Sequence, residues 1–97
     1  MPEGLLESIK LYLHVTWIDE STDLNLTGMI DRGMARLQKI AGAPLDFAVE
    51  DLPRSLLFDY CRYANSHALE VFEKNFSAEL LSLHIESQVA EVEVLPL

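Results

Sequence analysis

The segment from Asp19 to Asn25 has the oxygen-rich pattern of a calcium-binding loop. Its sequence, DESTDLN, places side-chain oxygens at the first, third, fifth and seventh positions of such a loop. The loop also needs glycine at its sixth position and glutamate at its twelfth, where this chain has Leu24 and Ile30. Aspartate, serine and threonine before an apolar run are also typical of a helix start. We therefore interpret the segment as a helix cap and expect no metal site.

Three histidines and one cysteine are the other side chains that could bind a metal or act as a nucleophile. His14, His67 and His84 are far apart in the sequence and share no spacing typical of metal ligands. Cys61 is the only cysteine, so it cannot form an internal disulfide. No basic residue adjoins it on its face of the predicted helix to activate the thiol. We expect Cys61 to be a buried apolar residue, and we predict no enzyme activity and no cofactor.

Charged side chains are arranged with helical spacing instead. On a helix with 3.6 residues per turn, four charged residues around Ser66 fall on one narrow stripe. Because a base lies among the acids, an ion-pair face explains the stripe better than a carboxylate pair for acid–base catalysis. Its charged members are Asp59, Arg62, Glu70 and Glu73.

A basic set lies on the preceding predicted helix. Arg32, Arg36 and Lys39 project from the side opposite its apolar residues. On an acidic protein such a set more often meets an acidic protein surface than phosphates, and the acidic stripe or tail of another copy is the obvious candidate. A solvated face without a partner and a nucleic-acid contact are the alternatives.

The overall charge restricts the class of partner. The formal net charge is −9, whereas binding to nucleic acid or to an anionic membrane depends on Lys and Arg. No apolar run approaches the ~20 residues that span a bilayer. Residues 1–13 also lack the basic start and the cleavage site of a signal peptide. We expect no membrane contact.

Four segments with helical periodicity predict an all-α fold, a single domain over residues 1–97 that forms a small bundle of four helices. We expect these helices at about 3–13, 21–41, 53–74 and 78–88. On the last of them we expect one face to carry Leu80, Leu81, His84 and Ile85 and the other to carry Glu79, Ser82 and Glu86.

Capping residues mark several of the predicted helix ends. Gly42 is a good stop for the second helix, and Asp51 can cap the third. For the start of the second helix Asp19, Ser21 and Thr22 are all plausible caps, and the sequence does not choose among them.

The C-terminal residues 89–97 change character. Glu91 to Val94 alternates between acidic and apolar residues, which predicts an extended segment, and Pro96 ends it. We expect an extended tail that is either frayed or reaches for a partner.

Residues 56–80 carry two adjoining apolar lines, whereas a surface helix normally has one. Two lines need cover from more than one side, and in a chain of 97 residues we expect another copy to supply part of it. Gly33, on the apolar side of the second helix, would let a neighbouring helix approach closely. The two lines are Leu57, Tyr60, Ala64, Ala68, Val71 and Phe58, Cys61, Leu69, Phe72.

We predict that an interface with another subunit or partner includes two aromatic residues beside the charged sets. Trp17, in the connection before the second helix, is either a core anchor or an interface anchor, because tryptophan is enriched at binding hot spots. The predicted interface residues are Trp17, Arg32, Arg36, Lys39, Asp59, Arg62, Glu70, Glu73 and Phe76.

Short packing motifs spread over about residues 5–88 carry a family resemblance. They are Leu11-Tyr12-Leu13 with Trp17, Ala41-Gly42 with Leu45-Asp46-Phe47, the run LLFDYCRY over 56–63, Ala68-Leu69-Glu70, Phe72-Glu73, Asn75-Phe76 and Glu79-Leu80. Together they resemble the bacteriophage head–tail connector family, the adaptor or head-completion proteins of phages and prophages of Gram-positive bacteria. The C-terminal segment 89–97 lies outside the likeness.

The resemblance implies a structural virion protein, made in the bacterial host cytoplasm and located at the head–tail junction. Such proteins assemble under the portal protein as a homo-oligomeric ring, a dodecamer in the virion, and dock the next head-completion or tail protein. Packaged DNA passes through the ring without specific binding. A ring needs two different faces that meet head to tail, and the basic and acidic sets would provide them.

The net charge also bears on the expected oligomeric state. Copies with a charge of −9 repel one another, so we expect a monomer in isolation at low salt, with rings favoured by the portal or by screening.

The alternative function is a small helical dimeric regulator or protein-binding module, similar to an antitoxin. It predicts a closed dimer, which a mass measurement with a portal protein would distinguish.

Overall fold

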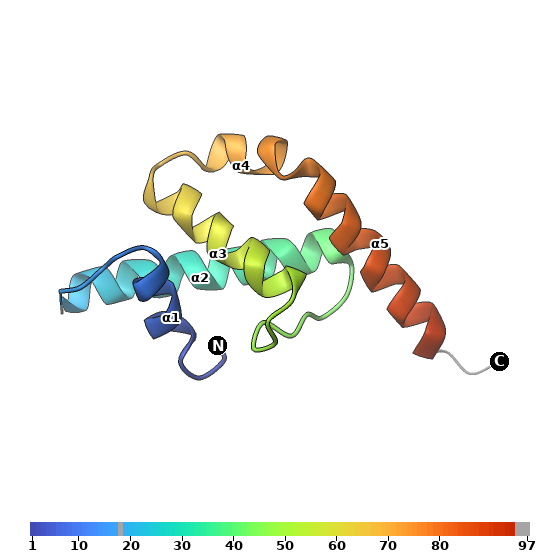
Figure 1. The fold of residues 1–97 in the computed structure, drawn as a ribbon, viewed down its shortest axis with the longest axis horizontal. Helices are drawn as coiled ribbons and strands as arrows, with labels where there is room; N and C mark the ends of the chain where they lie inside the picture. The colour runs from blue at the N-terminus through green and yellow to red at the C-terminus, as the bar shows by residue number, and fades with distance from the viewer. Residues whose placement is uncertain (18, 95–97) are drawn as a thin grey trace.

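The computed structural model describes residues 1–17 and 19–94, with side chains described as far as residue 89 (Figure 1). This part of the chain contains five α-helices and no strand, which confirms the all-α class. None of these helices is both long and apolar enough to cross a membrane. The helices are α1 Leu5–Tyr12, α2 Glu20–Ala41, α3 Leu52–Asn65, α4 Leu69–Asn75 and α5 Ser77–Val94.

The long helix α2 is the element on which the others assemble. Helix α3 packs along it, α1 contacts both, and α5 packs against its C-terminal part (Figure 1). Gly33 allows the close approach of α3, because a Cβ there would lie 2.7 Å from Cδ1 of Tyr60 and 2.8 Å from Cδ1 of Leu57. The expected close helix approach at Gly33 is therefore confirmed.

Side-chain and glycine caps fix the ends of α2 and the start of α3. Asp19 caps α2, accepting a hydrogen bond from the Ser21 N–H at 3.2 Å, so the structure selects one of the three candidate caps. Gly42 ends the helix with a φ of 73°, a left-handed conformation that glycine adopts without strain. Asp51 caps α3 through the Leu52 N–H at 2.8 Å, as the sequence predicted.

The predicted helix over 53–74 is wrong, because the chain breaks between α3 and α4. The Ala68 N–H donates to the Tyr63 carbonyl at 2.9 Å and the His67 N–H donates to the Ala64 carbonyl at 3.1 Å. These two bonds define a Schellman motif, in which a left-handed residue ends a helix. His67 takes that position with a φ of 55°. Because the residue there is not a glycine, the sequence contains no signal for the break.

Helix α1 ends in the same way. The Val15 N–H donates to the Lys10 carbonyl at 2.9 Å, and the His14 N–H donates to the Leu11 carbonyl at 3.1 Å. His14 is the left-handed residue here, with a φ of 60°. Two of the three histidines thus end helices through their backbone conformation.

A cluster of aromatic rings explains why α4 folds back instead of continuing α3. Phe72 of α4 is 1% exposed and its ring lies 5.5 Å from that of Tyr60 and 5.8 Å from that of Tyr63. Phe76 stacks on Phe72 at 5.2 Å and meets Tyr63 edge-on at 5.6 Å. Aromatic pairs at such distances stabilise by about 0.5–1.5 kcal/mol beyond the burial of their area. This cluster offsets the cost of the left-handed His67.

Helix α5 is longer than predicted and replaces the beginning of the expected tail. It runs to Val94, so residues 89–94 continue the helix and the extended conformation predicted for them is wrong. The acidic–apolar alternation of Glu91 to Val94 is too short to override helix continuation after four preceding turns. Residues 95–97 lie outside the described part of the chain. The fold is therefore a five-helix arrangement with α5 projecting from one end (Figure 1).

Candidate interaction surfaces

Arg36 and Glu73, from the predicted basic and acidic sets, meet within one chain. Arg36 donates from Nε and Nη2 to the two carboxylate oxygens of Glu73, both at 2.8 Å. This hydrogen bonding lowers the pKa of Glu73 and raises the pKa of Arg36. The pair ties α2 to α4, so a contact between copies has to rely on other charged residues.

Asp59 and Arg62 belong to a polar network that holds α1 against α3. The Tyr12 hydroxyl donates to Asp59 Oδ1 at 2.9 Å, and Arg62 Nη2 donates to the same oxygen at 3.3 Å. Burial, followed by the hydrogen bond to Asp59, raises the pKa of Tyr12. The Arg62 guanidinium also covers the ring of Tyr63, 4.9 Å from its centroid. Both predicted interface residues thus already have partners within the fold.

The remaining predicted interface residues divide between the interior and the surface. Phe76 is partly buried in the aromatic cluster. Trp17 is 55% exposed, and its indole N–H donates to the Thr22 hydroxyl at 3.3 Å, so it does not anchor the core. The side chains exposed to solvent are those of Trp17, Arg32, Lys39 and Glu70.

The apolar lines of residues 56–80 are mostly covered by the chain itself. On α3 the first line is buried at Leu57, Tyr60 and Ala64, and Cys61 of the second line is 0% exposed. The expectation that another copy must cover this helix is therefore wrong for α3. Helix α3 packs against α1, α2, α4 and α5. Only the α4 end leaves apolar surface, at Leu69 and Val71, 37% and 38% exposed.

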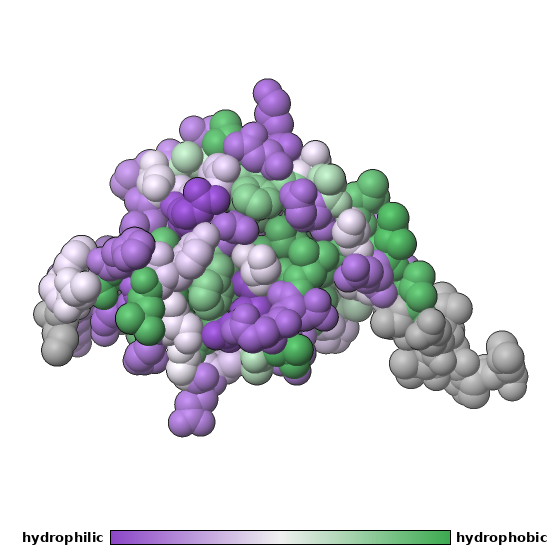
Figure 2. All heavy atoms as spheres, in the orientation of Figure 1, coloured by the Kyte–Doolittle hydropathy of each residue, from purple (hydrophilic) through white to green (hydrophobic). Residues whose placement is uncertain are grey.

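The main uncovered apolar surface lies on α5 instead. Leu81, Ile85 and Val89 are 59%, 53% and 51% exposed, and their spacing of four residues places them along one side of the helix. We call these three residues the α5 stripe. Figure 2 shows the hydrophobic side chains along the outer edge of α5. The sequence interpretation grouped Leu81 and Ile85 with the buried Leu80, although the second spacing to Val89 was a signal for a separate stripe.

Two polar contacts orient α5 so that this stripe faces outward. His84 Nδ1 donates to the Ile40 carbonyl oxygen at 2.9 Å, and Gln88 Nε2 donates to the Ala41 carbonyl oxygen at 3.0 Å. Both acceptors belong to the last turn of α2, whose carbonyls have no partner inside their own helix. These hydrogen bonds hold the inner face of α5 against the end of α2.

Other exposed apolar side chains lie at the opposite end of the molecule. Trp17, in the connection before α2, and Leu24, near the start of α2, are both more than half exposed. The start of α2 and the connection before it lie at one end of the long axis, and the C-terminal end of α5 lies at the other (Figure 1). The chain measures 52 Å along this axis. Its two apolar regions are therefore different surfaces.

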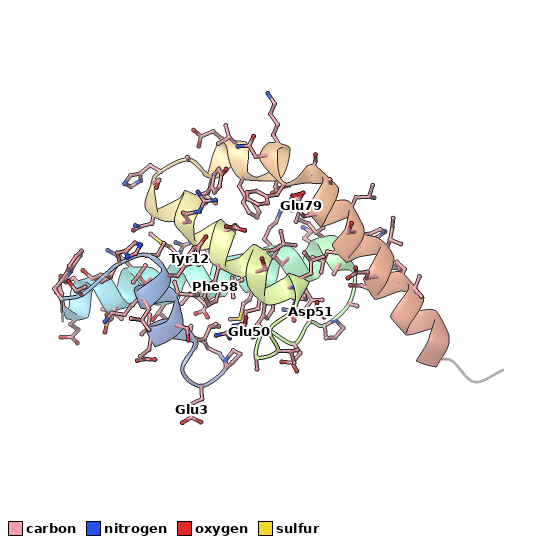
Figure 3. The ribbon with its side chains drawn as sticks, in the orientation of Figure 1. Glu3, Tyr12, Glu50, Asp51, Phe58 and Glu79 are labelled. Carbon is pink, nitrogen blue, oxygen red and sulfur yellow. The ribbon has the colours of Figure 1, made fainter. Side chains whose placement is uncertain are left out.

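The hollows beside α1 are shallow and open. One, of about 210 Å³, lies among Tyr12, Phe58 and Glu50, three residues labelled in Figure 3. A second, of about 370 Å³, is bordered by Tyr12, His14 and Arg62. Small-molecule sites are usually concave enclosures of about 300–1,000 Å³ that bury most of the ligand. Neither hollow has that enclosed form.

Neither an activated thiol nor a cluster of metal ligands is found among the described residues. Burial raises the pKa of the Cys61 thiol to about 12, and a thiol is nucleophilic only as the thiolate. Within residues 1–17 and 19–94, no three His, Cys, Asp or Glu side chains gather as a metal site would require. The candidate site is therefore the exposed apolar surface of α5.

Comparison of the chain with protein-family models, with curated proteins and with solved structures gave no match.

Proposed function

We propose that this chain is a structural subunit of a phage head–tail junction. It assembles as a ring under the portal protein, extends the DNA channel and docks the next head-completion or tail protein. The observation that carries this proposal is the α5 stripe, a half-exposed apolar surface on a chain whose core is closed without it. Contiguous apolar surface on a folded chain is a sign of an interaction site, and the three residues of the stripe adjoin one another along the helix.

The distribution of apolar surface supports repeated head-to-tail contacts. A closed dimer uses one surface that meets its own copy, whereas a ring uses two different surfaces. This chain presents apolar residues at both ends of its 52 Å axis. Two separate surfaces suit a subunit that has two neighbours of its own kind.

The charge suits a channel through which DNA moves. With a net charge of −9, the wall of a ring would repel a polyanion and would not hold it in place. We propose that the packaged DNA passes without specific contacts, and that the ring performs no chemistry on it.

The proposal is tested by mixing the purified chain with isolated rings of the portal protein encoded in the same genome. Mass photometry and electron microscopy should show a fixed number of copies added to each portal as a second ring. A chain that stays a closed dimer and ignores the portal would contradict the proposal and favour the dimeric regulator. Capsid and tail genes beside this reading frame would support the same conclusion at lower cost.

A further inference from the structure

Two basic side chains on α2 have no ion-pair partner among the described residues. Lys10, Arg36, Arg54 and Arg62 each pair with an acid of the same chain, and Arg32 and Lys39 do not. Arg32 and Lys39 are exposed and seven residues apart. That spacing is about two helical turns, so the two charges lie on one side of α2, roughly 10 Å apart along its axis.

Helix α5 carries a matching pair of acids. Glu79 and Glu86 are also seven residues apart, and within residues 1–17 and 19–94 neither forms an ion pair. Glu86 neighbours Val89 of the α5 stripe, because residues three or four apart are neighbours on a helix, and Glu79 lies two turns before Glu86 on the same side of α5. The sequence of α5 contains no lysine or arginine. Its free face is therefore an apolar stripe edged by negative charge.

The surface beside the two bases on α2 can receive an apolar stripe. Leu24 is 68% exposed, and Ala35 is exposed one turn from Arg32 and Lys39. Gly28 lies between Leu24 and Ala35 in the sequence. The Arg32 guanidinium folds back over Gly28, with Nη1 3.1 Å from the position that a Cβ would take. Small side chains leave room for a second helix to approach, and the guanidinium can swing to an acid on that helix.

The same chain cannot bring these two surfaces together. The inner face of α5 is held on the end of α2 by the hydrogen bonds of His84 and Gln88. Its outer face, with Leu81 and Ile85, therefore points away from the α2 of its own chain. No residue in the part of the chain that the structure describes covers it, which leaves it free for another molecule.

We propose that the α5 face of one copy packs along the exposed face of α2 in the next copy. Glu79 and Glu86 pair with Arg32 and Lys39, and the α5 stripe packs beside Ala35. The pairing is heterologous, since each copy contributes a different surface to each of its two neighbours. This inference rests on the proposed function, for which it supplies the contact between subunits.

A charge-swap experiment on portal-bound rings tests the contact. One variant carries Arg32→Glu and Lys39→Glu, and a second carries Glu79→Lys and Glu86→Lys. Each alone places like charges at the contact, and we expect ring formation to weaken at least about ten-fold. A mixture of the two variants, or one chain with all four changes, restores opposite charges at every contact and should restore rings.

A matched control separates the contact from the change in net charge. Glu3→Lys with Glu7→Lys alters the charge as much as the α5 variant does, on exposed positions of the first residues and α1. This control should form rings as the unmodified chain does. Circular dichroism of each variant confirms that the helices are intact before the rings are counted.

The outcomes distinguish the contact from the proposed function. If the unmodified chain forms rings and either single variant does so equally well, or if the mixture fails to restore them, the contact is overturned and the connector function stands. If the unmodified chain forms no ring on the portal at any concentration, both are overturned.

Discussion

The α3–α4 region and helix α5 are similarly rich in apolar residues but differ in how those residues are covered. Leu57, Cys61 and Phe72 are at most 1% exposed, because α2 lies on one side and the aromatic cluster folds α4 back on another. Ile85 and Val89 are about half exposed, because α5 contacts the body with its inner face alone. The comparison shows that apolar content alone does not tell which helix is exposed, because exposure depends on which elements of the chain cover it.

Truncation of one large apolar side chain in each region should give the largest difference. Phe72→Ala removes the centre of the aromatic cluster and should cost about 3–5 kcal/mol of unfolding free energy. Ile85→Ala removes an exposed side chain, and the unfolding free energy should change by no more than about 0.5 kcal/mol. Urea unfolding followed by circular dichroism measures both. Equal losses would contradict the assignment of one residue to the core and the other to the surface.

The two glycines of α2 compare the covered and the free faces of one helix. In Gly33→Ala the new Cβ meets Tyr60 and Leu57, and overpacking should cost about 1–3 kcal/mol, of which helix propensity offsets about 1 kcal/mol. In Gly28→Ala the neighbouring atoms belong to the flexible end of Arg32, so the helix should gain up to about 1 kcal/mol. Thermal unfolding of the two variants should therefore shift in opposite directions.

The break that encloses Phe72 can be tested at His67. A left-handed residue other than glycine costs about 1–2 kcal/mol, so His67→Gly should stabilise the fold by up to about 1 kcal/mol after the entropy of the unfolded chain is counted. His67→Val should destabilise it, because β-branched residues tolerate positive φ least. Denaturant unfolding reports both changes. A valine variant as stable as the histidine would indicate that α3 and α4 form one helix.

The Arg36–Glu73 pair should give the smallest and most pH-dependent effect. The folded pKa of Glu73 lies below its unfolded value because Arg36 donates to it. The stability this adds is present above the unfolded pKa, roughly 4.3, and is lost as the pH falls through the folded pKa. Glu73→Gln should cost about 0.2–1 kcal/mol at pH 7. The difference should shrink as the pH falls below that unfolded value, and a difference that stays constant with pH would exclude the ion pair as its cause.

Local signals in the sequence were sufficient for the fold class and for several helix ends. Asp51 and Gly42 mark helix ends by side-chain capping and by backbone freedom, and each acts within a few residues. The break at His67 depends instead on a Schellman turn without glycine and on rings brought together from α3 and α4. Helical periodicity in the sequence does not show which side chains meet once α4 folds back on α3.

The interface prediction also depends on contacts between helices, which the sequence does not show. The sequence placed Arg36 and Glu73 on their helices, but it could not show that α2 and α4 lie side by side within one chain. It also joined Leu81 and Ile85 to the buried side of α5. That assignment requires knowing which face contacts α2, and the hydrogen bonds of His84 and Gln88 decide it.

The large apolar residues of α3 are covered within one chain, whereas the α5 stripe is exposed, and on our proposal a partner covers it. Thiol labelling of an Ile85→Cys variant tests this claim directly, because the buried Cys61 serves as an internal reference. In the free chain we expect rapid labelling at position 85 and none at Cys61. On portal-bound rings, labelling at position 85 should slow at least about ten-fold, while Cys61 stays unreactive. Equal labelling at position 85 in both states, or rapid labelling of Cys61 in the folded chain, would contradict the claim.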